Sequence, residues 1–327
     1  MQPKLLDISK QPNGFRDSAF AKNKELPLHR WVPWIAGFSA GFVDDCLDKY
    51  LSNPRLENRW VLDPFAGVGT TLVQAYSRGV NVVGFEINPY AALAAKTKLH
   101  AVKVSTSHFA ERITAFERYM ERHGDNHSTS KSEPRSKPPV GFSGRSELFS
   151  PKVERKVLFA LDFINSLTEA EEQDLFRLAF GSVMVSVSNY SYEPSLTRRS
   201  AVDKPNIEDA RVGALLTEKL RMMLEDILWL QSHMQTIGLR PKGKIVPESI
   251  FSASRILKRT SFVDLVVTSP PYLNNYHYPR NTRPQLHWLG FASGPGYNGA
   301  GEVQSFGKFG RPYGIRLVST SRSDTRN

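Results

Sequence analysis

The sequence predicts a doubly wound, mainly parallel α/β sheet that is interrupted by a mostly helical insert. Two short apolar segments, which end at Asp63 and Glu86, flank a helical pattern, as in a βαβ unit. A third apolar, β-branched segment, residues 262–268, lies far downstream. The chain between these segments is much longer than a sheet needs at roughly 30 residues per βα unit, and its pattern is helical. We therefore expect an insert inside the sheet.

The chain before the first strand divides into two parts. Residues 1–27 are polar and rich in helix breakers, which predicts an irregular arm on the surface. The next segment contains Phe38 and then apolar residues at helical spacing, among them Cys46. Because Cys46 is the only cysteine, an internal disulfide and a cysteine-based zinc cluster are excluded, and we expect a buried, inert thiol.

A glycine turn follows the first strand, in the run Asp63-Pro-Phe-Ala-Gly-Val-Gly-Thr-Thr71. Gly67 and Gly69 allow a tight turn and the close approach of a ligand. Thr70 and Thr71 are expected to cap a helix that runs to about Arg78. The run lacks the third glycine of a dinucleotide fingerprint and the Gly-Lys-Ser/Thr of a phosphate-binding loop. A turn of this kind also occurs for packing alone.

The second strand, residues 82–85, ends at Glu86. Because carboxyl ends of neighbouring parallel strands meet at one edge, Asp63 and Glu86 should flank a ligand site there. Carboxylates in this position commonly accept hydrogen bonds from ribose hydroxyls. Asn88 is expected to cap an alanine-rich helix that runs to about Leu99.

The insert spans residues 101–241 and contains a polar linker at 123–147. Helices are predicted at 108–122, near 157–164 and near 175–187, and a buried stripe from Leu216 to Leu230 predicts a long one. His123 and His127 have the spacing of helical metal ligands, but their polar, glycine-containing surroundings argue against a metal site. A loop at 188–200 carries Arg198 and Arg199, which either contact DNA or belong to an ordinary exposed loop.

Composition limits the functional class. The net charge of +11 favours a polyanionic partner such as nucleic acid. The alternative is a soluble protein whose surface is basic without such a partner. No apolar stretch approaches the length of a membrane span, and the start lacks the apolar core of a signal peptide. We expect a cytoplasmic protein.

The second motif is Thr268-Ser269-Pro270-Pro271-Tyr272, which follows the strand at 262–268. The continuous apolar run predicts a strand that is buried on both faces, and the prolines hold the following turn rigid. Together, Asp-Pro-Phe-Ala-Gly-Val-Gly-Thr-Thr and Thr-Ser-Pro-Pro-Tyr resemble the motifs of the DNA amino-methyltransferases. The resemblance covers about residues 28–100 and 242–291 and is strongest to the cytosine-N4 group, although some adenine-N6 enzymes share the second motif.

The resemblance implies a Rossmann-like sheet that binds S-adenosylmethionine and acts on double-stranded DNA, most simply with a cognate restriction endonuclease as partner. Phe38 would pack on the methionine part of the cofactor, or is simply core. An acidic residue near the end of the third strand, which we expect within 242–250, would meet the adenine amino group, and Glu248 is the candidate. The implied cofactor residues are Phe38, Asp63, Pro64, Phe65, Gly67, Gly69, Thr70, Glu86 and Glu248.

The chemistry explains the second motif. The lone pair of an exocyclic amino nitrogen is delocalised into the base, and acceptors for its N–H bonds make it more nucleophilic. The Ser269 hydroxyl and the Pro270 carbonyl are such acceptors, Pro271 keeps the carbonyl aimed, and Tyr272 can stack on a flipped base. Methylation of a base carbon would need a cysteine nucleophile in a Pro-Cys setting, which is absent.

The last part of the sequence departs from the family pattern. Arg280 and Arg283 follow the catalytic turn and suit a DNA strand, or belong to a surface loop. Residues 292–327 are basic and glycine-rich, without the three strands that should complete the sheet. We therefore expect a shortened version of a longer enzyme. Two alternatives remain, namely a chain that binds DNA with little turnover, and a methyltransferase of RNA or of a protein amide.

Overall fold

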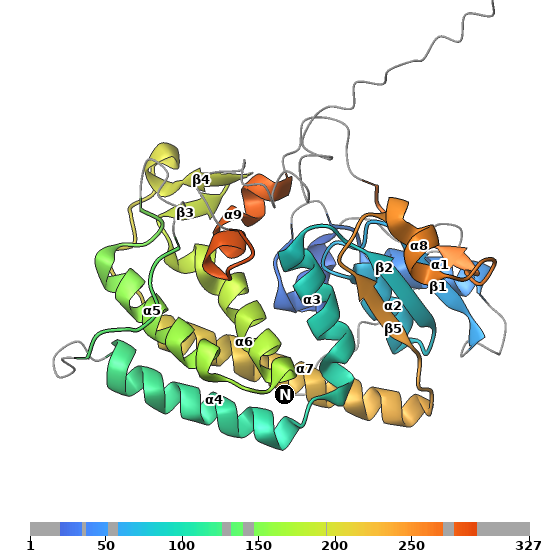
Figure 1. Ribbon diagram of the computed structural model, residues 1–327, viewed down its shortest axis with the longest axis horizontal. Helices are drawn as coiled ribbons and strands as arrows, with labels where there is room; N and C mark the ends of the chain where they lie inside the picture. The colour runs from blue at the N-terminus through green and yellow to red at the C-terminus, as the bar shows by residue number, and fades with distance from the viewer. Residues whose placement is uncertain are drawn as a thin grey trace, which may run out of the picture.

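The computed structural model describes residues 20–34, 37–51, 58–125, 132–139, 147–193, 195–270 and 278–292. Among these residues it contains a four-stranded parallel sheet, a two-stranded antiparallel sheet and a group of packed helices (Figure 1). The predicted α/β class with a parallel central sheet is confirmed. None of the helices in the described ranges is long and apolar enough to cross a membrane.

The central sheet is built from β1 (Trp60–Asp63), β2 (Asn81–Phe85), β5 (Gly243–Val246) and β6 (Leu265–Val266), in the spatial order β5-β2-β1-β6. All its pairs are parallel, with Leu62 opposite both Val83 and Val266. The strands thus stand in the order third, second, first, fourth, and the order reverses between β1 and β6. Such a reversal is where open α/β sheets bind ligands, outside the carboxyl ends of the strands.

Alternate side chains of β2 pack into two different apolar clusters, one on each face of the sheet. Val82 belongs to the main core, to which α1 (Ala40–Tyr50), α2 (Thr70–Ser77) and α3 (Pro89–His100) contribute. Val83 and Phe85 pack on the opposite face with Val246 and with apolar residues of α8 (Ala253–Leu257). The sheet therefore carries apolar partners on both faces, as the continuous burial of β2 requires.

The predicted strand at 262–268 is shorter and more exposed than expected. Only Leu265 and Val266 pair with β1, and the Val266 side chain is 52 % exposed. Within the described residues β6 is the edge of the sheet, so one side of the strand lacks the cover that a central position would give. The expectation of burial on both faces is wrong at Val266.

The segment 101–241 is largely helical. It contains α4 (Thr106–Met120), α5 (Pro151–Ser166), α6 (Ala170–Val183) and α7 (Val212–Ile237). The predicted stripe of α7 is confirmed, because Leu216, Leu220, Met223, Ile227 and Leu230 are all at most 1 % exposed.

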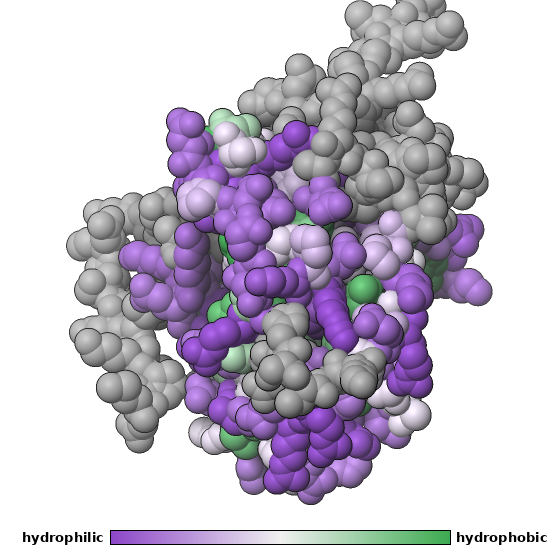
Figure 2. Space-filling model, turned by 90° about the vertical axis from the view of Figure 1, so that its left-hand side faces the viewer, coloured by the Kyte–Doolittle hydropathy of each residue, from purple (hydrophilic) through white to green (hydrophobic). Residues whose placement is uncertain are grey.

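The helical segment and the sheet form one continuous structure. Helix α7 runs from the helical lobe to the underside of the sheet (Figure 1), where it contacts α2. A single apolar core joins residues of α2 and α3 to residues of α4–α7. Figure 2 shows that the outer face of this lobe is mainly hydrophilic, with small scattered apolar spots.

The predicted loop at 188–200 is instead a short antiparallel hairpin of β3 (Tyr190–Tyr192) and β4 (Leu196–Arg198). Tyrosine, threonine and leucine suit a strand, and the turn at 193–195 is short enough to join two antiparallel partners. The hairpin lies beside α9 (Tyr278–Trp288), which follows the predicted catalytic turn in the sequence (Figure 1).

The segment before β1 is anchored more firmly than an irregular arm would be. The side chain of Asn23 is fully buried, where it donates to the Phe38 carbonyl (3.0 Å) and accepts from the Ala40 amide (2.9 Å). The surface position predicted for residues 1–27 is therefore wrong at Asn23. Residues 1–19 lie outside the described part of the chain.

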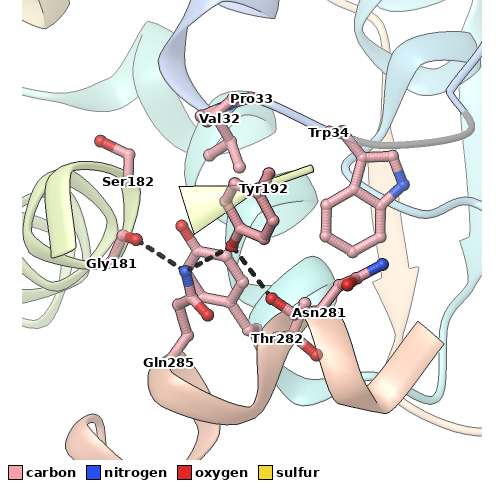
Figure 3. Close-up of a pocket in the computed structure, with 10 residues that line it drawn as sticks. Val32, Pro33, Trp34, Gly181, Ser182, Tyr192, Asn281, Thr282 and Gln285 are labelled. Atoms are coloured by element: carbon pink, nitrogen blue, oxygen red, sulfur yellow. Dashed lines mark hydrogen bonds between the residues drawn. The ribbon is translucent and has the colours of Figure 1, made fainter. Parts of the chain in front are cut away.

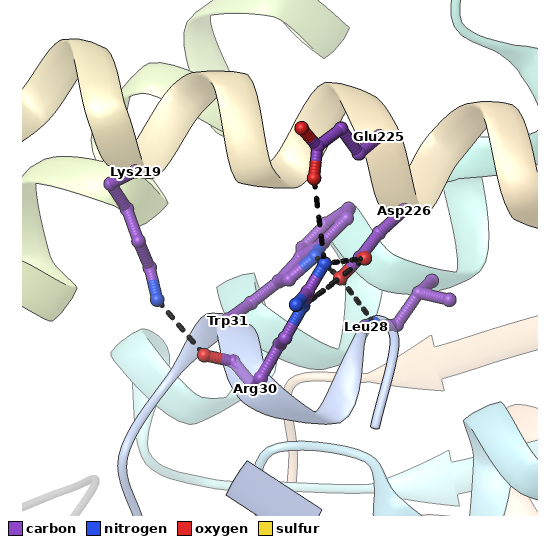
Figure 4. A network of polar contacts seen from close by, with 6 residues as sticks. All are labelled: Leu28, Arg30, Trp31, Lys219, Glu225 and Asp226. Atoms are coloured by element: carbon purple, nitrogen blue, oxygen red, sulfur yellow. Dashed lines mark hydrogen bonds and ion pairs between the residues drawn. The ribbon is translucent and has the colours of Figure 1, made fainter. Parts of the chain in front are cut away.

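A buried carboxylate on α7 fixes the next part of this segment (Figure 4). Asp226 accepts hydrogen bonds from the Leu28 amide (2.9 Å), the Trp31 indole (2.9 Å) and the Arg30 guanidinium (2.6 Å). The contact with Asp226 raises the pKa of Arg30 and outweighs the opposing effect of burial. Lys219, also on α7, donates to the Arg30 carbonyl at 2.9 Å. The helical lobe therefore sets the position of the chain just before Trp34.

Candidate active site

The glycine turn after β1 depends on two left-handed glycines. Gly67 has a φ of +52° and Gly69 a φ of +85°. A Cβ on Gly69 would lie 3.0 Å from the Ala95 Cβ, because α3 passes directly behind the turn. A Cβ on Gly67 would lie 3.5 Å from the Trp34 Nε1. Glycine is needed at both positions for its backbone conformation, and at Gly69 also for space.

The expected threonine caps are not found. Helix α2 begins after Gly69, which caps it without a side-chain bond, and Thr70 and Thr71 lie buried in the first turn. Thr71 Oγ1 instead donates to the Val267 carbonyl at 3.3 Å. The threonine thus joins the start of α2 to the chain that leaves β6.

Asp63 stands at the carboxyl end of β1 and is completely buried. Its Oδ1 accepts from the Phe65 amide (3.0 Å) and from the Thr268 hydroxyl (2.7 Å). Its Oδ2 is buried and has no hydrogen-bond partner. Burial raises the pKa of Asp63, and the contacts with the side chains of Thr268 and Thr71 and with the Phe65 amide oppose the shift. A buried carboxylate oxygen without a donor is a feature that a bound ligand would satisfy.

Glu86 follows β2 at the same edge of the sheet. Its Oε2 accepts from the Gly67 amide and its Oε1 from the Asn88 amide, both at 2.7 Å. Burial raises the pKa of Glu86 to about 7, although the side chain keeps some contact with solvent. Glu86 therefore stabilises the glycine turn and keeps lone pairs for a further donor.

A buried lysine lies beneath the glycine turn. Lys98 of α3 is 1 % exposed, and its Nζ donates to the Val68 carbonyl at 3.0 Å. Burial, and then the charge of Lys219, lower the pKa of Lys98 to about 7. His29 is buried nearby, and burial lowers its pKa to about 3, so this histidine is neutral at physiological pH.

Ser269 and Pro270 leave β6 at the same edge as Asp63 and Glu86, as predicted. Ser269 is partly exposed and Pro270 is exposed. The hydrogen bond from Thr268 to Asp63 holds the chain immediately before them. Pro271 and Tyr272 lie outside the described residues.

The remaining predicted cofactor residues occupy different surroundings. Pro64 and Phe65 form the turn after Asp63, and both are partly exposed. Phe38 is also partly exposed and packs edge-on against Phe42, with ring centroids 6.3 Å apart. Glu248 lies past the end of β5, where its carboxylate pairs with Arg255 at 2.6 Å.

The four predicted DNA-contacting arginines lie around the hairpin and α9. Arg198 ends β4 and is partly exposed, and the neighbouring Arg199 donates from Nε to the Pro205 carbonyl at 2.7 Å. Arg283 lies on α9 and is partly exposed. Arg280 is on the same helix, and its side chain lies outside the described part.

A small cavity adjoins this region (Figure 3). It measures about 30 Å³, enough for one or two water molecules, and Trp34, Tyr192 and Gln285 are among the residues that line it. Gln285 donates to the Gly181 carbonyl at 3.1 Å, whereas its Oε1 is buried without a partner.

The described residues contain no cluster of metal-binding side chains. His123 instead stacks on Phe159, at 5.8 Å between ring centroids, and His127 lies outside the described residues. Cys46 is buried as predicted, and burial raises the pKa of its thiol.

Sequence comparisons relate this chain to DNA methylases. Residues 22–97 match the family model for DNA methylases. The chain is 25 % identical over 290 residues to the type II methyltransferase M.AvaI of Nostoc sp., and 24 % identical over 299 residues to M.BsoBI of Geobacillus stearothermophilus. The predicted resemblance to DNA amino-methyltransferases is confirmed. M.MvaI of Kocuria varians, also a type II methyltransferase, is 25 % identical over 242 residues.

These alignments cover the two proteins unequally. The M.AvaI and M.BsoBI alignments each cover 83 % of this chain, but only 56 % and 54 % of those relatives; for M.MvaI the shares are 71 % and 51 %. The chain thus spans about half the length of the relatives that it matches. No solved structure matches it.

Three polar contacts of the site were not predicted from the sequence. These are Thr268 to Asp63, Lys98 to Val68, and Asn88 Nδ2 to Thr282 Oγ1 at 2.9 Å. Thr268 is part of the quoted second motif, and its place beside Asp63 follows once the two strands are paired. The other two contacts link segments whose proximity no local pattern indicates.

Proposed function

We propose that this chain is an S-adenosylmethionine-dependent methyltransferase that modifies an exocyclic amino nitrogen in DNA, with cytosine N4 preferred over adenine N6. The observation that carries the proposal is the strand order third, second, first, fourth, because it brings Asp63, Glu86 and the Ser269-Pro270 turn to one edge. The match of residues 22–97 to DNA methylases supports the same reaction class. We also infer that the complete sheet is doubly wound and Rossmann-like, since apolar clusters cover both of its faces.

The residues at this edge fit the cofactor. The unpartnered Oδ2 of Asp63 and the remaining lone pairs of Glu86 are acceptors for its amino and hydroxyl groups. Gly67 and Gly69 leave room for close approach, and Pro64, Phe65 and Thr70 shape the same turn. Phe38 and Glu248 are proposed for the methionine and adenine ends. When bound, S-adenosylmethionine supplies an electrophilic methyl group.

The catalytic turn acts on the base. The Ser269 hydroxyl and the Pro270 carbonyl accept hydrogen bonds from the N–H groups of the target amine and increase its nucleophilicity. Pro271 restricts the turn, and Tyr272 stacks on the flipped base. No covalent bond to the enzyme is required, which agrees with a single cysteine, Cys46, that is buried on α1.

The mostly helical segment 101–241, with its linker at 123–147, is proposed to recognise the target sequence. It lies between a cofactor-binding part, residues 28–100, and a catalytic part, residues 242–291. Arg198, Arg199, Arg280 and Arg283 are the proposed DNA contacts, and the net charge of +11 favours binding to the phosphates. The matched relatives are type II methyltransferases, so we propose a restriction–modification role with a cognate endonuclease.

Mass spectrometry of nucleosides tests the activity directly. DNA from cells that express the chain should contain N4-methylcytosine or, less expectedly, N6-methyladenine. The absence of both would refute methylation of DNA. Transfer to RNA or to a protein amide, measured on the same purified sample, would support the alternative substrates.

The variant Tyr272→Ala tests the assigned roles. It should lose methyl transfer and keep the cofactor affinity of the wild type, because it removes base stacking alone. A parallel loss of cofactor binding would contradict the role assigned to Tyr272.

A second candidate function is a chain that binds DNA and cofactor but turns over poorly. The observation in its favour is the short β6 strand, in which only Leu265 and Val266 pair with a neighbour. Calorimetry with S-adenosylmethionine, combined with a methyl-transfer assay, separates the two functions. Binding without transfer favours the second, whereas full turnover by the purified chain excludes it.

A further inference from the structure

We propose that Asn88 is a positioning residue that couples the cofactor site to the catalytic turn through Thr282. The proposal rests on the function proposed above. It assigns a role to two buried residues that neither sequence motif includes. Asn88 is 5 % exposed and Thr282 4 % exposed.

The first step is the contact between Asn88 and the cofactor site. The Asn88 backbone amide donates to Glu86 Oε1 at 2.7 Å, and Glu86 Oε2 in turn accepts from Gly67. Asn88 Oδ1 caps α3 by accepting from the Tyr90 amide at 3.0 Å and the Ala91 amide at 3.3 Å. The cap fixes the rotamer of Asn88, so the direction of its remaining amide group is also fixed.

The second step leads to the catalytic turn. Asn88 Nδ2 donates to Thr282 Oγ1 at 2.9 Å. Thr282 lies on α9, which begins shortly after Ser269 and Pro270 in the sequence. The described residues on either side of this part of the chain are therefore both anchored, Thr268 on Asp63 and Thr282 on Asn88. Both anchors come from the cofactor-binding strands and the loops that follow them.

The neighbouring residue Asn281 connects α9 to the hairpin (Figure 3). Tyr192 Oη donates to the Asn281 carbonyl at 2.9 Å, and the Leu196 amide donates to Asn281 Oδ1 at 2.9 Å. Adjacent residues of α9 thus contact the cofactor part and the proposed recognition part. Because the Asn88–Thr282 and Leu196–Asn281 hydrogen bonds are buried, a shift of α9 would break contacts that water cannot readily replace.

Thr282→Val removes the acceptor hydroxyl at nearly constant volume, and Thr282→Ser is the matched control that keeps it. In single-turnover assays on DNA that carries the target site, Thr282→Val should slow methyl transfer by about tenfold or more, since small displacements of reacting groups have large kinetic effects. Its cofactor affinity should stay within about twofold of wild type. Thr282→Ser should recover most of the rate. A variant that merely folds poorly would lose cofactor affinity together with rate, so a slow rate at wild-type affinity distinguishes lost coupling from lost folding.

Hydrogen exchange with S-adenosylmethionine alone provides a readout that does not require transfer. Cofactor should slow amide exchange in residues 278–292 of the wild type and of Thr282→Ser, but not of Thr282→Val. Equal rates and equal protection in Thr282→Val and wild type would overturn the coupling. A wild type that binds cofactor and couples to α9 but methylates no substrate would refute the proposed reaction and leave the coupling supported. A wild type that binds no cofactor would overturn both.

Discussion

The two sides of the strand-order reversal are built differently. On the β1–β2 side, Asp63 and Glu86 hold the glycine turn through backbone amides, and most neighbouring side chains are buried. On the β6 side, two residues pair with β1, and Val266 and Pro270 are exposed. The β1–β2 side, which is proposed to bind the cofactor, is thus preorganised by its own hydrogen bonds. The β6 side, with the proposed catalytic turn, depends on contacts with distant segments. We expect substitutions on the two sides to separate binding from transfer.

The largest expected effect is from Asp63→Ala, which removes a completely buried carboxylate that organises both motifs. We expect cofactor affinity to fall by about a hundredfold or more, because the turn loses its anchor and the ligand loses an acceptor. Isothermal titration calorimetry with S-adenosylmethionine measures this loss of affinity.

Asp264→Ala is the matched control at the opposite end of the same strands. Asp264 accepts from the Trp60 amide at 2.8 Å and pairs with Arg59. This variant should keep the cofactor affinity of the wild type and lose about 1 kcal/mol of stability. Equal losses of affinity in the two variants would mean that the cofactor side is not specifically organised by Asp63.

The next largest effect is expected from Gly69→Ala, which should lower the free energy of unfolding. The φ of +85° costs a residue with a side chain about 1–2 kcal/mol, and the new Cβ would press on Ala95. We expect a total loss of about 3 kcal/mol in urea unfolding. Gly238→Ala is the control, since its φ is +67° and nothing lies within 4 Å of its added Cβ. An equally large loss of stability in Gly238→Ala would show that the close packing of α3 against Gly69 is not the cause.

The pH dependence of cofactor binding tests Glu86. Its pKa of about 7 means that the carboxylate, the form that accepts two hydroxyl donors best, becomes predominant above neutrality. Cofactor affinity should rise about tenfold between pH 6 and 8, in proportion to the ionised fraction. Glu86→Gln should abolish this rise. A wild-type affinity that is independent of pH would contradict the assignment.

Stability should change with pH in the opposite sense. The folded chain retains the Glu86 proton up to about pH 7, whereas an unfolded glutamate releases it near pH 4.5. The folded state therefore binds more protons, and the contribution of Glu86 to the free energy of unfolding falls as pH rises through this window. The free energy of unfolding of Glu86→Gln, measured in urea, should lack that contribution.

The smallest effect is expected at the hairpin. Arg198→Ala should weaken DNA binding by a few-fold and reduce the salt slope of binding by about 1, as for one lost phosphate contact. Lys49→Ala, an exposed position on α1 within residues 28–100, is the charge-matched control. If both variants weaken binding equally, DNA is held by overall charge and not by the hairpin.

The sequence predicted those parts of the fold that local pattern determines. The glycine turn, the cap at Asn88, the stripe on α7 and a third strand within residues 242–250 are all confirmed. The cap by Thr70 and Thr71 is wrong, because Gly69 itself begins the helix. The exposure of Val266 and the hairpin at 190–198 depend on which segments lie alongside, and this information is absent from any short window of residues. The roles assigned to the site residues remain predictions.

The continuous core shared by the sheet and by α4–α7 bears on how target preference can change during evolution. A recognition domain with its own core can be exchanged between enzymes as a unit, since few contacts cross its boundary. Here such an exchange would remove α7 and with it Asp226, which anchors the chain before Trp34. Under the proposed function, new target preferences should therefore arise by substitutions on the polar outer surface and the hairpin, and not by transfer of whole segments.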